Sequence, residues 1–567
     1  MQQLWIPLWV FASLFSIFQT GFIPMYSTRT LGVAWEMWNS GQFIVPYSNG
    51  EPYSHKVPLL FWLIHVGWAI GGVGEVWPRL LQVIAGLGVI LFARRLARVL
   101  WPQTTEVASL VPWIMTAFSY AFIFSLQIMY EVLLSLCVLA ALNALIRRHV
   151  TQQPAFFWFG LAIAAGLMTK GPVMLLHIAF PFLLGPLWHP WAAAHRARWY
   201  AQGTLALAGG FAVLVAWALA AAEIGGEVYR NELFFMQTAG RVVDSFDHAQ
   251  AWWWYLSMLP ALMAPWILWP RAWRALTAVV MHERSIGMRF VACWVLPVFV
   301  AFSLISGKQA YYLLPEATAG AMVLAAGIAR LRGRQTRAWR ASGGWLLAAL
   351  MFAMAFALWR LPAWVADGSV DSVWYVDLSL ASPWFAALAA ALGIVFASTP
   401  REDVAATRWI GGTAVAAMAL VYALFAQTIW VRFDLRPAAA HVAALETAGV
   451  PIAHYDLYHT QLQFLARLQR PMSVLFPDTI EAWAHAHPDG RVLHYAKPLT
   501  LDDLRHAEFI QPFRSDWLII ERADSWVRRR RGEQAPLPAH PAVLAPAHYW
   551  PYRALLGPSA RGTDTPG

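Results

Sequence analysis

A long polar stretch, residues 26–65, follows an apolar amino-terminal segment and could carry chemistry at a bilayer edge. Mixtures of charged groups and aromatic rings are typical of the membrane interface, where a site can hold a charged head and an apolar tail together. We therefore expect lipid-phosphate chemistry here. The side chains on which this expectation rests are Arg29, Glu36, Glu51, His55 and Lys56, with Trp35, Trp38, Phe43 and Tyr53 among them.

The composition requires a membrane protein with many spans. Of the 567 residues, 59% are hydrophobic and only 13% are charged, which is too apolar for a soluble chain. The formal net charge of +10 comes largely from arginines in short segments between apolar runs. This pattern favours positively charged inner loops over nucleic-acid binding. Cys137 and Cys293 lie in apolar runs and form neither a disulfide framework nor a CxxC metal site.

Two topologies compete at residues 58–74. If this segment crosses the bilayer, the next span carries Arg94, Arg95 and Arg98 to the outside, against the positive-inside rule. If it lies along the outer interface as a juxtamembrane helix, the basic loops fall inside. We adopt the second topology because it satisfies this rule, and it places the amino terminus in the cytoplasm. The terminus has no basic region or cleavage site typical of a signal peptide, so we expect the first span to be retained.

This topology predicts roughly thirteen spans, each near the ~20 residues that a bilayer requires. One pair is broken, with Lys170-Gly171-Pro172 at its outer turn. The predicted transmembrane domain is 1–431, with a first extracytoplasmic loop at about 25–78. Besides the broken pair, the spans are about 5–24, 79–93, 107–124, 130–146, 202–222, 252–269, 290–305, 313–329, 343–360, 382–398 and 409–430.

Residues 432–567 have the composition of a soluble domain, which the topology places outside the cytoplasm. Alternating helix and strand patterns predict a small α/β domain with a loose tail from about residue 536. The expected helices are 437–449 and 460–469, and the expected strands are 450–456, 491–495 and 516–521.

The topology also brings many ionisable residues of the apolar part to one face. Ionisable groups that converge on one leaflet predict a site that opens to that side. The residues expected on the outer face are Arg29, Glu36, His55, Lys56, Glu131, Lys170, Arg241, His248, Lys308 and Tyr312.

Several short motifs in this order resemble a known family. They are Trp35-Glu36-Met37, Ser40-Gly41, Val45-Pro46, Asn49-Gly50, Pro52-Tyr53 and His55-Lys56-Val57-Pro58-Leu59, with Gly307-Lys308, Tyr312 and Leu314-Pro315 further on. They look like the polyprenyl-phosphate-sugar-dependent glycosyltransferases of the GT-C fold. These include the lipid A aminoarabinose transferases and, more distantly, the protein O-mannosyltransferases.

The resemblance implies a cradle for a lipid phosphate. Lys56 matches the family lysine that contacts the carrier phosphate, although a lysine anchoring a helix end is the alternative. Arg241 matches the family's arginine, and Tyr312 and Lys308 fit its Gly-Lys and Tyr pattern. For Lys170, a helix break with a snorkelling lysine is about as plausible as a phosphate contact. Further polar contributors are Arg29, His55 and His248.

The resemblance also shows a departure at the position of the catalytic acid. Where the family has an acidic pair, this chain has Tyr26-Ser27. The remaining carboxylates in matched motifs are Glu131 and Glu36, and we expect Glu131 to be the base or acceptor-orienting group and Glu36 to be structural. No metal site is predicted, but a divalent cation bound through His55 and His248 stays an open alternative.

Together these patterns predict an inner-membrane glycosyltransferase. Its donor would be a monosaccharide on polyprenyl (undecaprenyl) phosphate, and its acceptor a lipid A-like glycolipid, a glycan or a protein outside the cytoplasm. No cofactor and no nucleic acid are required. The alternative is a non-catalytic member of the same fold that binds the lipid carrier after losing the acidic pair.

Overall fold

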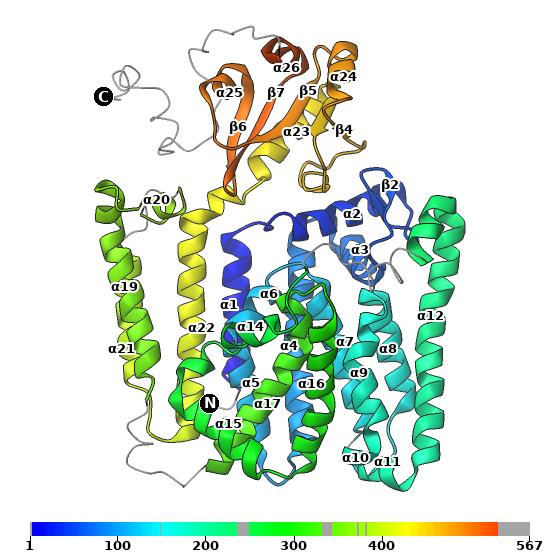
Figure 1. Cartoon of the computed structure of the whole chain (residues 1–567), viewed down its shortest axis with the longest axis vertical. Helices are drawn as coiled ribbons and strands as arrows, with labels where there is room; N and C mark the ends of the chain where they lie inside the picture. Colours follow the sequence, from blue (N-terminus) through cyan, green and yellow to red (C-terminus); the bar gives the residue numbers. More distant parts are fainter. Residues whose placement is uncertain are drawn as a thin grey trace.

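The computed structural model describes residues 3–147, 149–234, 249–331, 343–370, 373–379 and 383–530. Figure 1 shows a bundle of upright helices with a small sheet above one end. We call that end the sheet side. Between the bundle and the sheet lie two helices that run across the bundle, α2 (Tyr26–Ser40) and α3 (Leu59–Gly71).

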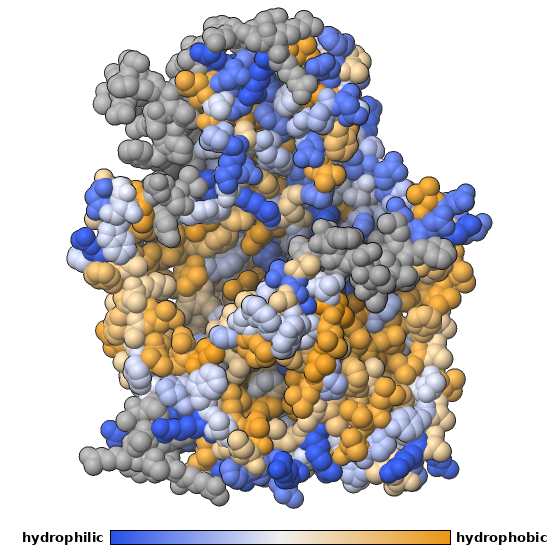
Figure 2. Space-filling model, viewed as in Figure 1, coloured by the Kyte–Doolittle hydropathy of each residue, from blue (hydrophilic) through white to orange (hydrophobic). Residues whose placement is uncertain are grey.

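The bundle is built from apolar helices. Among the described residues, six helices are long and apolar enough to cross a membrane, and further apolar helices are shorter. Figure 2 shows the result as a broad hydrophobic band with hydrophilic surface above and below it. The upright helices are α1 (Trp5–Gln19), α4 (Val76–Leu100), α5 (Thr105–Ala117), α7 (Tyr130–Leu145), α8 (Phe156–Lys170), α9 (Val173–Leu183), α12 (Arg196–Asn231), α16 (Ile286–Leu304), α17 (Leu314–Leu331), α19 (Trp345–Ala366), α21 (Pro383–Ala397) and α22 (Asp403–Gln427).

Shorter helices connect these elements. They are α6 (Ser119–Ser125), α10 (Gly185–Trp188), α11 (Pro190–Ala194), α14 (Trp254–Leu262), α15 (Pro270–His282) and α20 (Val373–Ser379), with the 3₁₀ turns η2 (Trp266–Leu268), η3 (Ala310–Leu313) and η4 (Ile429–Arg432).

Basic loops from different parts of the chain meet at the end of the bundle away from the sheet. Arg95 donates hydrogen bonds to the side chain of Asn143 and to the carbonyl of Arg147. Arg271 likewise donates to the carbonyl of Arg401. The first contacts hold the end of α4 against the end of α7, as the predicted alternation of spans requires, and the last joins the start of α15 to the segment before α22. The assignment of this end to the cytoplasm stays a prediction.

Residues 58–74, for which the sequence allowed two topologies, contain α3. This helix is too short to be among the six long candidate spans. With α2 it encloses a separate hydrophobic cluster that includes Leu31, Phe61 and Trp68. Helix α2 ends at Gly41, whose φ of 69° is in the left-handed region that favours glycine. Two crossing helices therefore cover the sheet side of the bundle, as expected for juxtamembrane helices.

Two predicted spans differ from the structure. The span predicted at 107–124 is divided into α5 and α6 at Phe118, whose backbone is extended. Residues 252–269 do not form a single helix but the nine-residue α14 followed by a break and the turn η2. Pro260 lies inside α14 and Pro265 follows it, and each proline lacks the N–H that a continuing helix would donate.

The sheet above the bundle is mixed, with strand order β4-β3-β5-β7-β6. Strand β3 pairs in parallel with β4 and β5, whereas β7 pairs antiparallel with β5 and β6. Its elements are α23 (Arg436–Thr447), β3 (Ile452–Tyr455), β4 (Ser473–Leu475), α24 (Ile480–Ala486), β5 (Arg491–Ala496), α25 (Leu501–His506), β6 (Ala507–Phe513), β7 (Asp516–Arg522) and α26 (Ala523–Arg530).

The predictions for this part of the chain are correct for one helix and three strands. The helix expected at 460–469 is wrong, because this segment is a series of turns. Thr460 and Arg467 both have a φ of 54°, which a right-handed helix does not allow. The domain boundary at 431/432 stays a prediction, and the predicted loose tail lies outside the described residues.

Candidate active site

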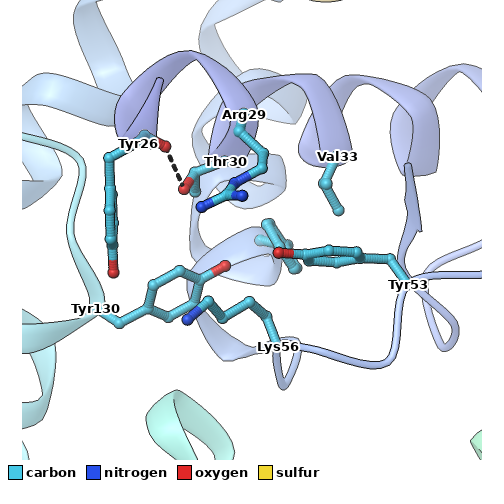
Figure 3. Close-up of a pocket in the computed structure, with 8 residues that line it drawn as sticks. Tyr26, Arg29, Thr30, Val33, Tyr53, Lys56 and Tyr130 are labelled. Atoms are coloured by element: carbon cyan, nitrogen blue, oxygen red, sulfur yellow. Dashed lines mark hydrogen bonds between the residues drawn. The ribbon is translucent and has the colours of Figure 1, made fainter. Parts of the chain in front are cut away.

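A small pocket opens between α2, the loop that precedes α3, and the start of α7. Its empty space, open mouth included, is about 220 Å³, and Figure 3 shows its lining. Helix α2 contributes one face of residues spaced three or four apart, as neighbours on a helix surface are. The lining residues are Tyr26, Arg29, Thr30, Val33, Tyr53, Lys56, Phe61 and Tyr130.

Two cations lie at this pocket. Arg29 points down from α2 towards Tyr130, and the Lys56 ammonium approaches from the loop to 5.1 Å from the centroid of the same ring. Arg29 has no ion-pair partner among the residues that the structure describes. A guanidinium and an ammonium on one recess, lined otherwise by phenols and apolar groups, have the charge and the donors to bind a small anion such as a phosphate.

A carboxylate network lies directly behind the pocket. Glu131 lies in the first turn of α7 and is only 2% exposed. It forms an ion pair of 2.8 Å with Lys170 at the end of α8. Its other oxygen accepts a hydrogen bond of 3.2 Å from the Tyr26 hydroxyl. The helix dipole at the amino end of α7 also favours a negative charge there. Glu131 therefore pairs with Lys170. The sequence offered Arg29 and Arg241 as alternative partners; Arg29 makes no ion pair with it, and Arg241 lies outside the described residues.

Tyr26 occupies the position where the related family has an acidic residue, and its phenol serves as a donor. Burial, reinforced by the negative charge of Glu131, raises the pKa of the Tyr26 hydroxyl well above its ordinary value. The phenol is therefore protonated at neutral pH. Its neighbour Ser27 has a local structural role, because its hydroxyl donates to Gln127 and accepts from the backbone N–H of Ile128.

The second candidate carboxylate, Glu36, lies elsewhere. Its two oxygens accept backbone hydrogen bonds from Asn49 at 2.6 Å and Gly50 at 2.8 Å. These residues form the turn between the two-residue strands β1 (Tyr47–Ser48) and β2 (Glu51–Pro52), with φ values of 55° and 83°. The Asn49 side chain in turn exchanges two hydrogen bonds of 2.8 Å with the backbone of Met472. Glu36 thus fixes a hairpin that contacts the sheet.

The remaining predicted residues divide into three groups. Tyr312 lies beside the network, with its ring centroid 4.3 Å from the Lys170 ammonium. Lys308 lies apart from the pocket lining, because its ammonium donates to the carbonyls of Gln250 and Ile305 at 2.9 and 2.6 Å. His55 is exposed and packs against the ring of Tyr53. Arg241 and His248 lie outside the described residues.

Three phenols line the pocket, and sequence reasoning assigned none of them a role in it. Tyr130 was not singled out, Tyr53 was named only among the aromatic side chains of residues 26–65, and Tyr26 only as the replacement for an acid. Tyr53 lies in a matched motif and Tyr130 directly precedes Glu131, so both could have been found as neighbours of predicted site residues. Among the described residues, no group of three or more His, Cys, Asp or Glu is placed to hold a metal ion.

Known proteins resemble this chain over a segment that includes part of the candidate site. Residues 54–218 match the family described as dolichyl-phosphate-mannose-protein mannosyltransferase. The undecaprenyl phosphate-alpha-4-amino-4-deoxy-L-arabinose arabinosyl transferase 2 of Pseudomonas fluorescens is 28% identical over 55% of this chain and 56% of its own length. The corresponding transferase of Edwardsiella ictaluri is 28% identical over 60% of this chain and 62% of its own. The chain thus matches these relatives over less than two thirds of their length.

The structural similarity to known proteins covers more of the chain than the sequence similarity does. The crystal structure of ArnT from Cupriavidus metallidurans bound to undecaprenyl phosphate superposes with a TM-score of 0.71, covering 91% of this chain and 97% of that protein at 15% identity. Its apo state gives the same TM-score. The chain is therefore an α-helical membrane protein of the GT-C fold that resembles the lipid A aminoarabinose transferases.

Proposed function

We propose that this protein is a glycosyltransferase that moves a monosaccharide from undecaprenyl phosphate to a lipid A-like acceptor outside the cytoplasm. The observation that carries the proposal is the convergence of Arg29 and Lys56 on one recess beside a buried carboxylate. The similarity to transferases named for an undecaprenyl-phosphate donor supports this reading. A glycan or a protein as acceptor is a second candidate, supported only by the match to the mannosyltransferase family.

In this proposal Arg29 and Lys56 bind the phosphate of the donor. During transfer the bond between the sugar's anomeric carbon and the phosphate oxygen breaks, and negative charge builds on the phosphate. Two cations at the recess stabilise that charge more in the transition state than in the bound donor. The carrier's isoprenoid chain would extend into the hydrophobic band of the bundle.

Glu131 is the proposed base or acceptor-orienting group. The acceptor hydroxyl loses its proton as its oxygen attacks the anomeric carbon, and a carboxylate near that oxygen can receive it. Both oxygens of Glu131 are engaged, and the 3.2 Å bond from Tyr26 is the weaker of the two contacts. An acceptor hydroxyl can take the place of Tyr26, while Lys170 keeps the carboxylate oriented. Lys170 thus acts through Glu131.

The test is a transfer assay with the purified full chain in lipid nanodiscs. The donor is undecaprenyl-phosphate-linked aminoarabinose, the acceptor is lipid A, and the readout is the mass of the acceptor. A gain of one sugar that is absent in Glu131→Gln supports the proposal. Tight binding of undecaprenyl phosphate with no transfer from any donor would favour the non-catalytic alternative.

A further inference from the structure

A second pocket lies where the sheet-side end of α1 meets the start of α4 and the first residue of α23. Its empty space, including its open mouth, is about 510 Å³. Its lining combines two arginines, Arg79 and Arg436, with one carboxylate, Glu75, and the apolar side chains of Phe18 and Val76. None of these residues lines the candidate active site.

Arg79 is a buried cation with spare hydrogen-bonding capacity. It is 6% exposed, and its two terminal nitrogens donate to the carbonyls of Ile17, Thr20 and Gly21, which end α1. Its Nε has no partner among the described residues. Buried polar atoms are nearly always hydrogen-bonded, so this guanidinium, which belongs to the pocket lining, has one donor that the described protein atoms do not use.

The pocket lining also contains a second cation, Arg436, and an anion, Glu75. Arg436 is 52% exposed and holds Asp434 through two hydrogen bonds. Glu75, which is half-buried, has no ion pair within the described part of the chain. Two guanidinium groups match a phosphate, and a carboxylate in the same lining matches an ammonium group.

The apolar side of the pocket continues along α1. Phe18 is 74% exposed and Val76 is 50% exposed. One helical face below them carries Phe15 stacked on Phe11, with ring centroids 6.1 Å apart. Such a face in the hydrophobic band is covered by lipid chains. A ligand with a polar head at the arginines would therefore lay its tail on this face.

We propose that this pocket binds the headgroup of a zwitterionic phospholipid, one that carries both a phosphate and a primary amine. Arg79 and Arg436 take the phosphate, Glu75 takes the ammonium group, and an acyl chain follows Phe18 and the face of α1 below it. The proposal concerns a structural lipid and is independent of sugar transfer.

The test is native mass spectrometry of the full chain released from micelles that contain equal amounts of phosphatidylethanolamine and phosphatidylglycerol. The wild type should retain phosphatidylethanolamine in preference. Arg436→Gln should lower the retained lipid roughly tenfold, the effect of one charge-assisted hydrogen bond. Glu75→Gln should keep phosphate-bearing lipid but lose the preference for the amine. Arg79 is left intact because it also holds the end of α1.

Arg230→Gln is the matched control, since Arg230 is 49% exposed and makes a single surface ion pair with Glu223 on α12. It should behave as the wild type. Equal retention by the wild type, Arg436→Gln and Glu75→Gln would overturn the proposal, as would the same loss in Arg230→Gln. Displacement of the lipid by inorganic phosphate or glycerophosphoethanolamine at millimolar concentration would identify a site for soluble anions instead and would also overturn it.

Discussion

Two glutamates in the same layer of this molecule, Glu131 and Glu36, have similar chemistry but different surroundings. Glu131 is buried at the start of α7 and faces a cation and a phenol, both of them side chains that can move. Glu36 is held by two backbone N–H groups of one turn. A carboxylate engaged by side chains can exchange a partner for substrate, whereas one engaged by backbone stabilises a conformation. On this difference we base the proposal that Glu131 takes part in the chemistry and that Glu36 has a structural role.

The largest expected effect is on transfer by Glu131→Gln. The amide keeps the shape and can still accept from Tyr26, but it cannot take a proton. We expect transfer to fall by about 10²- to 10⁴-fold, the usual contribution of a general base, while binding of the lipid phosphate is retained. Initial rates with saturating donor measure this. Transfer at the wild-type rate would remove Glu131 from the chemistry.

Glu36→Gln should give the opposite pattern. Replacing the carboxylate weakens the two charge-assisted bonds to Asn49 and Gly50 and loosens the hairpin that contacts Met472. We expect a loss of about 1–3 kcal/mol in the free energy of unfolding, seen as a lower Tm. Transfer per folded molecule should stay close to that of the wild type. A variant with unchanged Tm and lost transfer would reverse the assignment of the two glutamates.

Gly50→Ala tests the same hairpin without touching a charge. Gly50 has a φ of 83°, and a Cβ there would come within 2.6 Å of the Pro471 side chain. Strain at the turn and the clash should together cost on the order of 1–3 kcal/mol. The Tm should therefore fall as it does for Glu36→Gln, with lipid binding intact. The nearby Gly41→Ala is the control for left-handed strain alone, because no atom lies within 4 Å of its Cβ position.

Tyr26→Phe should have the smallest effect. It removes one hydrogen bond of 3.2 Å to Glu131 and leaves the Lys170 pair in place. We expect a change in transfer of roughly two- to tenfold in either direction, since one such bond is worth ~0.5–1.5 kcal/mol. Rates of the two proteins at equal donor concentration measure this. A loss as large as that of Glu131→Gln would make Tyr26 an essential partner of the carboxylate.

The sequence predicted the crossing helix α3 from charge alone, because Arg94, Arg95 and Arg98 allowed only one alternation of spans. It also placed Glu131, Lys170 and Tyr312 on one face, and the structure brings them together. It could not pair Glu131 with Lys170, because that contact depends on how α7 packs against α8, which no local pattern encodes. From the sequence, the alternative partners of Glu131 were Arg29 and Arg241.

Local backbone explains where the sequence patterns failed. Residues 460–469 have a helical spacing of apolar groups, but left-handed conformations at Thr460 and Arg467 turn the chain against the sheet. There Thr460 also packs against Gly32 of α2, leaving 2.6 Å between its carbonyl and a Cβ at that glycine. Tertiary contact between distant segments therefore overrides the periodicity. In 252–269, by contrast, two prolines were visible and could have shortened the predicted span.

The most direct measurement of the central claim is the affinity for undecaprenyl phosphate of the double variant Arg29→Gln with Lys56→Gln, compared with Arg230→Gln and the wild type in the same nanodiscs. Because each lost charged contact is worth ~1.5–3 kcal/mol, the Kd of the double variant should rise more than about a hundredfold, while that of Arg230→Gln should not change. An unchanged Kd in the double variant would show that the recess between α2 and α7 does not hold the lipid phosphate.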